Sequence, residues 1–316
     1  MDFTDKRVLV VGTGVSGVAA IRLLAAKGAK PVVLEGNEKA DREQIRAKIP
    51  ESITYDLIIG NLPEEVMDTL DLAVLSPGVP TDLPFVIKLQ DKKIPVWGEI
   101  ELAYVCGKGR LAAITGTNGK TTTTALTGAI MREYYDSVFV VGNIGLPYTE
   151  YALEMKDSSV TVAEVSSFQL ETIHSFRPEV SAILNITPDH LNRHHTMDCY
   201  IKTKEAITTN QTKDEVCVLN YEDEVLRAFG ESAPVHVVWF SSARKLAEGF
   251  YLDGEEIFYA HDGNTEKVIN VNDLNLLGRH NYENVMAATA MSVNFGVPME
   301  KIVEVLKRFQ AVEHRI

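Results

Sequence analysis

Short apolar runs alternate with helical stretches along residues 1–97. Five of these runs, RVLVV, KPVVLE, LIIG, DLAVLS and IPVW, have the length and unbroken hydrophobicity of strands that are buried on both faces. The segment 15–27, between the first two runs, is predicted to be a helix. Strands that alternate with helices favour a parallel, doubly wound sheet.

A second series of the same kind begins near Gly107. Its predicted strands are LAAIT, SVFVVG, SVTVAEV, VSAILNI, EVCVLN and HVVWFS, and its predicted helices cover residues 120–132, 147–155, 197–209, 222–229, 280–295 and 298–309. An Asp-Gly pair inside GFYLDGEEIFYA predicts a β-hairpin. We therefore expect one domain at residues 1–97 and a second at residues 98–311.

The first glycine motif, GTGVSG at residues 12–17, follows a strand and opens a helix. Glycines at these positions allow a tight turn and let a phosphate approach backbone N–H groups. Glu35 ends the second strand, where a carboxylate can accept a hydrogen bond from a ribose hydroxyl. The motif fits a dinucleotide or a UDP group equally well. A glycine turn that only packs the helix against the strand is the third interpretation.

The second glycine motif, TGTNGKTT at residues 115–122, also lies between a strand and a helix. It ends as a P-loop does, so Lys120 is expected to neutralise the β- and γ-phosphates and Thr121 to bind Mg²⁺. Ile114 stands where the general P-loop pattern has glycine. The two series together predict an α/β fold, with an N-terminal Rossmann-like doubly wound sheet followed by a P-loop-type mononucleotide-binding α/β domain.

Polar side chains follow two strands of the second series. Glu164 is the second-last residue of SVTVAEV, and the pair Asp189-His190 follows VSAILNI. The carboxyl ends of strands face the ligand crevice in open α/β sheets, so Glu164 is a candidate Mg²⁺ ligand and His190 a candidate ligand of a second metal ion. His194 and His195 invite the same interpretation, but we expect at least one of them to be simply exposed.

Charge and composition narrow the classes of partner. The formal net charge is −13, which disfavours binding to nucleic acid or to an anionic membrane surface. The three cysteines have no metal-ligand spacing, and the N-terminus has no secretory signal pattern, so a reducing cytoplasm is expected. No apolar run reaches the length that spans a bilayer.

Seven motifs occur in the order found in the Mur ligases, which the chain resembles over nearly its whole length. They are SPGVP (76–80), GEIEL (98–102), TGTNGKTT (115–122), GNIGLP (142–147), EVSSFQLE (164–171), ILNITPDHLNRH (183–194) and GRHNYEN (278–284). GNIGLP and SSFQLE are the most discriminating pair. They indicate the branch that uses ATP and Mg²⁺ to join D-glutamate to UDP-N-acetylmuramoyl-L-alanine through an acyl phosphate.

The resemblance implies a role for each motif. The UDP-substrate would contact Gly14, Val15, Ser16, Ser76, Pro77, Gly78, Asn143, Ser166 and Gln169. ATP would be held by Gly116, Thr117, Asn118, Gly119, Lys120, Thr121, Thr122, Asn281, Asn284 and Arg315. Lys120, Glu164, His190 and Lys204 would be catalytic, and Thr121, Glu164, His190 and Lys204 would hold two Mg²⁺ ions. In the family a helix lysine is N-carboxylated by CO₂, and Lys204 occupies that position, after a loop one residue shorter than in some members.

The family also has a C-terminal domain that closes over ATP. Residues 312–316 resemble the start of the linker into it, so we expect these 316 residues to bind substrate, as a monomer, without turning it over. Two other interpretations stay open at this point. One is an NAD-dependent oxidoreductase that uses the first glycine loop, which would leave the second loop unexplained. The other is a non-catalytic nucleotide-binding module.

Overall fold

The chain folds into two compact units, and each unit is built from three segments that alternate along the sequence. A computed structural model describes residues 1–310. Unit 1 contains residues 1–108, 145–156 and 168–176, and unit 2 contains residues 109–144, 157–167 and those from 177 onward. Unit 1 runs past residue 97 because the helix at Glu99–Cys106 packs on other elements of this unit. The predicted domain boundary at 97/98 stays a prediction.

Unit 1 is built on a five-stranded parallel sheet with the order β3-β2-β1-β4-β5. Apolar side chains of the strands are buried on both faces, as the unbroken hydrophobic runs predict. The order of the strands reverses at the β1–β4 pair, which is where ligands bind in sheets of this kind. The elements are β1 (Arg7–Val11), α1 (Val15–Ala26), β2 (Lys30–Glu35), α2 (Arg42–Arg46), β3 (Asp56–Ile59), α3 (Glu64–Met67), β4 (Leu72–Leu75), α4 (Pro84–Asp91), β5 (Val96–Gly98), α5 (Glu99–Cys106) and α7 (Tyr148–Tyr151).

Helix α5 holds the two later segments of unit 1 through buried carboxylates. Glu99 Oε1 accepts hydrogen bonds from the amide and the hydroxyl of Thr149, both at 2.7 Å. The Glu101 carboxylate accepts from the amides of His174 (2.9 Å), Ser175 (2.7 Å) and Phe176 (3.0 Å), and from the Ser175 hydroxyl at 2.6 Å. Buried carboxylates are tolerated when they are hydrogen-bonded in this way.

Unit 2 is built on a nine-stranded sheet with the order β14-β13-β12-β11-β10-β9-β6-β8-β7. The strands from β7 to β12 in this order pair in parallel, and β13 and β14 complete an antiparallel edge. The strands are β6 (Arg110–Thr115), β7 (Val138–Gly142), β8 (Val160–Glu164), β9 (Val180–Ile183), β10 (Val216–Asn220), β11 (His236–Ser241), β12 (Gly249–Asp253), β13 (Glu256–His261) and β14 (Asn264–Asn270).

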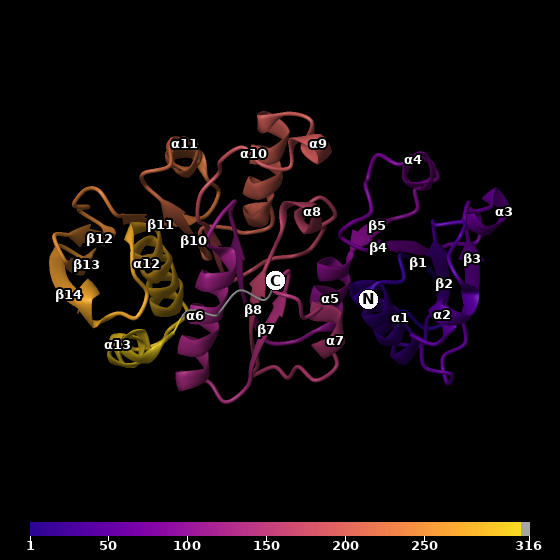
Figure 1. Ribbon diagram of the computed structural model, residues 1–316, viewed down its shortest axis with the longest axis horizontal. Helices are drawn as coiled ribbons and strands as arrows, with labels where there is room; N and C mark the ends of the chain where they lie inside the picture. Colours follow the sequence, from indigo (N-terminus) through magenta and orange to yellow (C-terminus); the bar gives the residue numbers. More distant parts are fainter. Residues whose placement is uncertain (311–316) are drawn as a thin grey trace. The chain divides into compact units, whose positions relative to one another are not determined.

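The helices of unit 2 bury an apolar core against this sheet. Figure 1 shows the two longest, α6 and α12, side by side over the strands, and they pack on each other directly. The helices are α6 (Lys120–Tyr134), α9 (Leu191–His194), α10 (Met197–Glu205), α11 (Glu224–Ser232), α12 (Arg279–Asn294) and α13 (Met299–Arg308), with 3₁₀ turns at Ala206–Thr208 and Val271–Asp273. Helix α8 (Ser167–Leu170) begins at the last residue of the middle segment of unit 2.

The predicted α/β fold class is confirmed, and so are the hairpin, which is β12–β13, and the six long strands of the second series. The predicted helix at 147–155 is only one turn long, at Tyr148–Tyr151. Within residues 1–310, no helix has the length and apolar character needed to cross a membrane.

Candidate active site

The glycine loop of unit 2 connects β6 to α6 and leaves the start of the helix open to a ligand. Gly116 and Gly119 adopt φ angles of 148° and 84°, which other residues rarely adopt. A Cβ on Gly119 would lie 2.3 Å from Asn284 Oδ1, so any other residue there would also displace the Asn284 side chain. The first turn of α6 has no side-chain cap, and its amide N–H groups have no partner within the helix. This end of the helix is suited to bind phosphate.

Asn185, just after β9, holds the loop by three hydrogen bonds. Its carbonyl oxygen accepts from the Thr117 amide (2.9 Å), and its Oδ1 accepts from the Asn118 amide (2.8 Å). Its Nδ2 donates to the Asn118 carbonyl at 3.1 Å. Asn185 is not among the site residues predicted from the sequence. The rule that singled out Glu164, a polar residue at the carboxyl end of a strand, applies to it equally.

Two lysines converge on the carbonyl oxygen of Gly116. Lys120 Nζ donates to it at 3.0 Å and also to the Thr117 carbonyl at 2.9 Å. Lys204 Nζ donates to it at 2.8 Å from α10, with only 2% of the residue exposed. Burial lowers the pKa of Lys120, against the charges of Glu164 and Asp189. Burial, and then the charge of Lys120, lowers the pKa of Lys204 to about 7.

Tyr200 of α10 contacts both Lys204 and the glycine loop. Its hydroxyl lies 3.1 Å from Thr117 Oγ1, and the Lys204 ammonium lies 4.7 Å from the centre of its ring. The Thr117 hydroxyl also donates to the Thr187 carbonyl at 3.1 Å. The loop is therefore fixed from β9 and α10 before any ligand arrives, which favours a preorganised phosphate site.

Glu164, at the end of β8, presents a buried carboxylate oxygen. The residue is 1% exposed, and Asn143 Nδ2 donates to its Oε1 at 2.8 Å. Its Oε2 is also buried and has no hydrogen-bond partner among residues 1–310. A buried, unpartnered carboxylate oxygen is costly unless a cation completes it. Oxygen ligands are those that Mg²⁺ prefers, so this atom suits a magnesium ion.

Two other predicted metal ligands, His190 and Thr121, lie at the same edge of the sheet. Unlike Glu164, both are exposed. His190 is exposed, with a φ of 50° and its Nε2 3.4 Å from Asp189 Oδ2. Thr121 is exposed on the first turn of α6. Residues 1–310 contain no cluster of three or more His, Cys, Asp or Glu side chains arranged for a metal ion. Metal binding by His190 stays a prediction.

The start of α12 completes the surroundings of the loop. Asn284 Nδ2 lies 3.3 Å from Asn281 Oδ1, and the Thr123 hydroxyl donates to Asn284 Oδ1 at 3.3 Å. Asn281 Nδ2 donates to the Leu277 carbonyl at 2.8 Å. The structure thus brings both predicted asparagines to the glycine loop, whereas the predicted ATP residue Arg315 lies outside the described residues.

The glycine loop of unit 1 lies at the point where the strand order reverses. Gly12 has a φ of 99°, and a Cβ on Gly17 would lie 2.0 Å from the Gly12 carbonyl oxygen, so α1 can approach the loop only with glycine at this position. Ser76 Oγ, after β4, is buried without a partner among residues 1–310. Val15, in the first turn of α1, is 73% exposed. An exposed valine and an uncapped helix start offer an apolar contact and an anion site side by side.

Glu35 and Lys48 support this loop from the second strand and from the segment after α2. The Thr13 hydroxyl donates to Glu35 Oε2 at 2.5 Å, and the Asn37 amide donates to Glu35 Oε1 at 3.1 Å. Lys48 Nζ donates to the Thr13 carbonyl at 3.4 Å. Lys48, Thr13 and Val15 are among the residues that line an open groove of about 530 Å³. Glu35 therefore orients the loop, and Lys48 is a cation that the sequence analysis did not single out.

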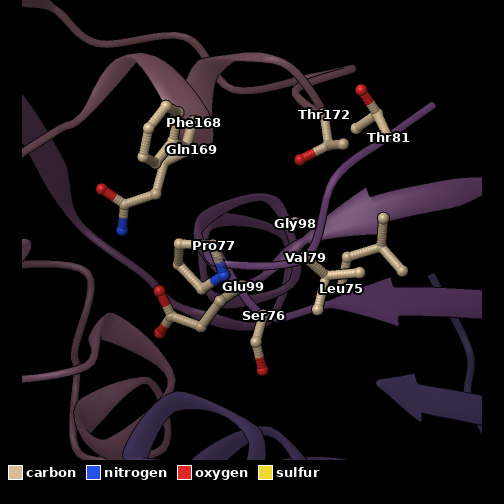
Figure 2. A pocket seen from close by; sticks show the side chains of 10 residues that line it. All are labelled: Leu75, Ser76, Pro77, Val79, Thr81, Gly98, Glu99, Phe168, Gln169 and Thr172. Atoms are coloured by element: carbon tan, nitrogen blue, oxygen red, sulfur yellow. The ribbon is translucent and has the colours of Figure 1, made fainter. Parts of the chain in front are cut away.

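A small pocket in unit 1 gathers three of the predicted substrate residues. Figure 2 shows its side chains, which come from the end of β4 and the loop after it, the β5–α5 junction, and α8 with the segment that follows it. Ser76, Pro77 and Gln169 lie together here, while Asn143 and Ser166 belong to unit 2. Burial raises the pKa of Glu99 in the wall of this pocket.

Fold and site define a protein of two α/β units, each with a glycine loop between a strand and a helix, and comparison with known proteins gives its family. The Mur ligase middle domain matches residues 114–292, and the Mur ligase MurD-like N-terminal domain matches residues 6–98. The chain belongs to the Mur ligase family.

The curated relatives include two with high identity along the whole chain. UDP-N-acetylmuramoylalanine–D-glutamate ligase of Lachnoclostridium phytofermentans is 54% identical over 316 residues, which are 100% of this chain and 70% of that protein. The enzyme of the same name from Lachnospira eligens is 55% identical with the same coverage.

Solved structures share the fold at low sequence identity. A UDP-N-acetylmuramate:L-alanyl-gamma-D-glutamyl-meso-diaminopimelate ligase from Neisseria meningitides has a TM-score of 0.63 at 17% identity, covering 98% of this chain and 100% of that one. The UDP-N-acetylmuramate-alanine ligase of Thermotoga maritima has a TM-score of 0.57 at 22% identity, covering 98% of this chain and 70% of that one.

Proposed function

We propose that this chain carries the UDP-substrate site and the ATP site of a ligase that joins D-glutamate to UDP-N-acetylmuramoyl-L-alanine. Relatives of that name match the whole chain at up to 55% identity. The observation that carries the proposal is the open glycine loop at Gly116–Lys120, flanked by the buried, unpartnered Glu164 Oε2.

The ATP site would use the groups gathered around this loop. The amides at the start of α6 and the Lys120 ammonium would bind the β- and γ-phosphates, with Gly116, Thr117, Asn118 and Thr122 forming the rest of the cradle. Asn281 and Asn284 would contact the nucleotide from α12, and Arg315 would follow from beyond the described residues. Because Asn185 and Tyr200 already fix the loop, little ordering is needed when ATP binds.

Magnesium fits the oxygen groups at this edge of the sheet. Glu164 Oε2 and the Thr121 hydroxyl would hold one ion, and His190 together with N-carboxylated Lys204 would hold a second. A bound Mg²⁺ neutralises phosphate charge and orients the oxygens of the transferred group.

Lys204 would act as an N-carboxylated lysine. Its neutral nitrogen would attack CO₂, form an N–C bond and lose a proton. Its burial in α10, with one carbonyl acceptor at Gly116, supports this assignment together with the family resemblance. The negative charge of the product would face Lys120 and remove the repulsion between the two ammonium groups.

The reaction would proceed in two transfers. A carboxylate oxygen of the UDP-substrate attacks the γ-phosphorus of ATP. The bond from this phosphorus to the oxygen that bridges it to the β-phosphate breaks, ADP departs, and the substrate becomes an acyl phosphate. The D-glutamate amine then attacks the acyl carbon and loses a proton, and the bond to the phosphate oxygen breaks. The chain contributes positioning and charge, since Lys120 faces the phosphates and no protein nucleophile is required.

The UDP group would lie on unit 1. The start of α1, from Gly14 to Ser16, would receive its phosphates, and Ser76, Pro77, Gly78 and Gln169 would contact the rest of the substrate. Ser76 Oγ, buried without a partner, supports this placement.

Calorimetry of the 316-residue chain with UDP-N-acetylmuramoyl-L-alanine, Mg²⁺ with ATP, and NAD tests the proposal. We expect the first two to bind independently, and Lys120→Ala to remove only ATP binding. Tight NAD binding without UDP binding would instead support the oxidoreductase. We further propose a monomer in the cytoplasm that releases negligible ADP on its own; a dimer in sizing chromatography, or robust turnover, would contradict these two points.

A further inference from the structure

His194, at the end of α9, is buried next to an exposed histidine. It is 2% exposed, whereas His195 is exposed, which confirms that at least one of the two is simply a surface residue. A hydrogen bond of 2.9 Å joins His194 Nε2 to Ser167 Oγ, and Ser167 is itself 3% exposed. The two side chains come from segments that are 27 residues apart.

The other side of the His194 ring packs on Tyr200. The two ring centres are 5.2 Å apart with an angle of 47° between the planes. The Tyr200 hydroxyl lies 3.1 Å from Thr117 Oγ1 in the glycine loop. A continuous series of contacts, buried at Ser167, His194 and Tyr200, therefore runs to the half-buried Thr117.

The two ends of this series carry different parts of the ATP site. Thr117 belongs to the loop that cradles phosphate, and Ser167 lies three residues after Glu164. The parallel pairing of β6 with β8 ends where Ile114 faces Glu164, followed by one backbone hydrogen bond from the Val165 amide. Ser167 is also the last residue before the chain passes into unit 1. Beyond the end of the strands, the His194–Ser167 hydrogen bond connects this segment to α9.

We propose that His194 is a positioning residue of the ATP site, holding the segment after Glu164 in register with the glycine loop through its contacts with Ser167 and Tyr200. The proposal rests on the function assigned above. Its consequence is specific, because misalignment of Glu164 weakens the contribution of Mg²⁺ to ATP binding. It leaves the binding of ATP without metal, and of the UDP-substrate to unit 1, unchanged.

The test compares ATP affinity with Mg²⁺ and with EDTA, by calorimetry on the 316-residue chain. His194→Phe keeps a ring against Tyr200 and removes the hydrogen bond. Ser167→Ala removes the same bond from the other side, at little risk to folding. A net hydrogen bond corresponds to a change of about three- to tenfold, so we expect each variant to weaken ATP binding by that factor with Mg²⁺ only. His194→Gln, which retains hydrogen-bonding groups, should restore most of the affinity.

Two comparisons separate positioning from simple stability. In a double-mutant cycle, the two changes together should weaken binding no more than either alone, because they remove one shared contact. His195→Phe is the matched control and should bind as the wild type does. Equal losses with and without Mg²⁺, or wild-type affinity in both folded single variants, would overturn the proposal. A wild-type chain that binds no ATP would overturn the proposed function, and the positioning role with it.

Discussion

Lys120 and Lys204 donate hydrogen bonds to the same atom, the carbonyl oxygen of Gly116, at 3.0 and 2.8 Å. Two ammonium groups that share one acceptor repel each other, and both are largely removed from water. Burial lowers the pKa of both lysines, and for Lys204 the charge of Lys120 lowers it further. Anionic ligands, such as the phosphates of ATP, would relieve the repulsion.

The pH dependence of stability should show the burial of Lys204. Its pKa falls from an ordinary 10.5 to about 7 in the folded chain, so between these values the unfolded chain holds a proton that the folded chain lacks. Stability rises with pH wherever the unfolded state binds more protons. The test is therefore to measure the free energy of unfolding with urea in CO₂-free buffer. From pH 7 upward, this free energy should rise for the wild type relative to Lys204→Met by at most about 1.4 kcal/mol per pH unit.

Lys202 provides the control for this measurement, because it lies on the same helix and is exposed. Lys202→Met should follow the wild-type pH profile. A constant difference between the wild type and Lys204→Met from pH 7 to pH 9.5 would show that the buried lysine keeps an ordinary pKa.

Glu164→Gln should separate metal binding from folding. The substitution keeps an oxygen that accepts from Asn143 but removes the negative charge from the buried Oε2 position. We expect the affinity for ATP with Mg²⁺ to fall at least about tenfold, since charged oxygen ligands dominate Mg²⁺ sites. Without Mg²⁺, ATP binding should be unchanged and the melting temperature equal or higher, because an unpartnered buried charge is gone. Undiminished binding of ATP with Mg²⁺ would exclude Glu164 as a ligand.

Lys48→Met should weaken the binding of UDP but not of uridine. Lys48 Nζ lies 3.4 Å from the Thr13 carbonyl, next to the start of α1, where an anion is favoured. Loss of one charged contact corresponds to about three- to tenfold in affinity. Lys39→Met removes an exposed lysine of the same unit and should have no effect. If uridine binding weakens as much as UDP binding, the contact is not with the diphosphate.

The three cysteines should differ in reactivity. Cys199 is exposed, while burial raises the pKa of Cys106 to about 11 and that of Cys217 to about 12. Thiolates are the reactive form, so at pH 7.5 a thiol reagent should modify one cysteine of the folded chain quickly. The other two should react only after unfolding, and Cys199→Ser should abolish the fast phase. A second fast thiol would show that one of the buried sites opens readily.

The hydrophobic pattern predicts much of the fold. The elements that it does not predict are missed for physical reasons. Long buried strands and α6 or α12 carry a periodic signal, whereas α2 and α3, at Arg42–Arg46 and Glu64–Met67, are too short to show one. The strand at Asn264–Asn270 has only two buried residues, because it lies at the edge of the sheet. The short helix at Tyr148–Tyr151 is held by Glu99, 50 residues away, which no local pattern records.

The candidate site divides in the same way. The motifs located the glycine loops and Glu164, because each motif is local in sequence, whereas Lys204 came only from the family resemblance. Asn185 and His194 act across 67 and 27 residues, through contacts that appear only once the strands are assembled. The motif identifies Glu164, but only the structure shows that its Oε2 is buried without a hydrogen-bond partner among residues 1–310.

Because unit 1 includes two segments from later in the chain, it cannot be isolated by truncating the chain at one position. A fragment ending at Lys108 would carry all five strands of the first sheet yet lack residues 145–156 and 168–176. Glu101 would then lose every one of its four donors, and Glu99 would lose both donations from Thr149. A single cut after the amino-terminal sheet would thus leave two carboxylates without these donors, so we expect the fragment to be less stable than the same residues in the whole chain.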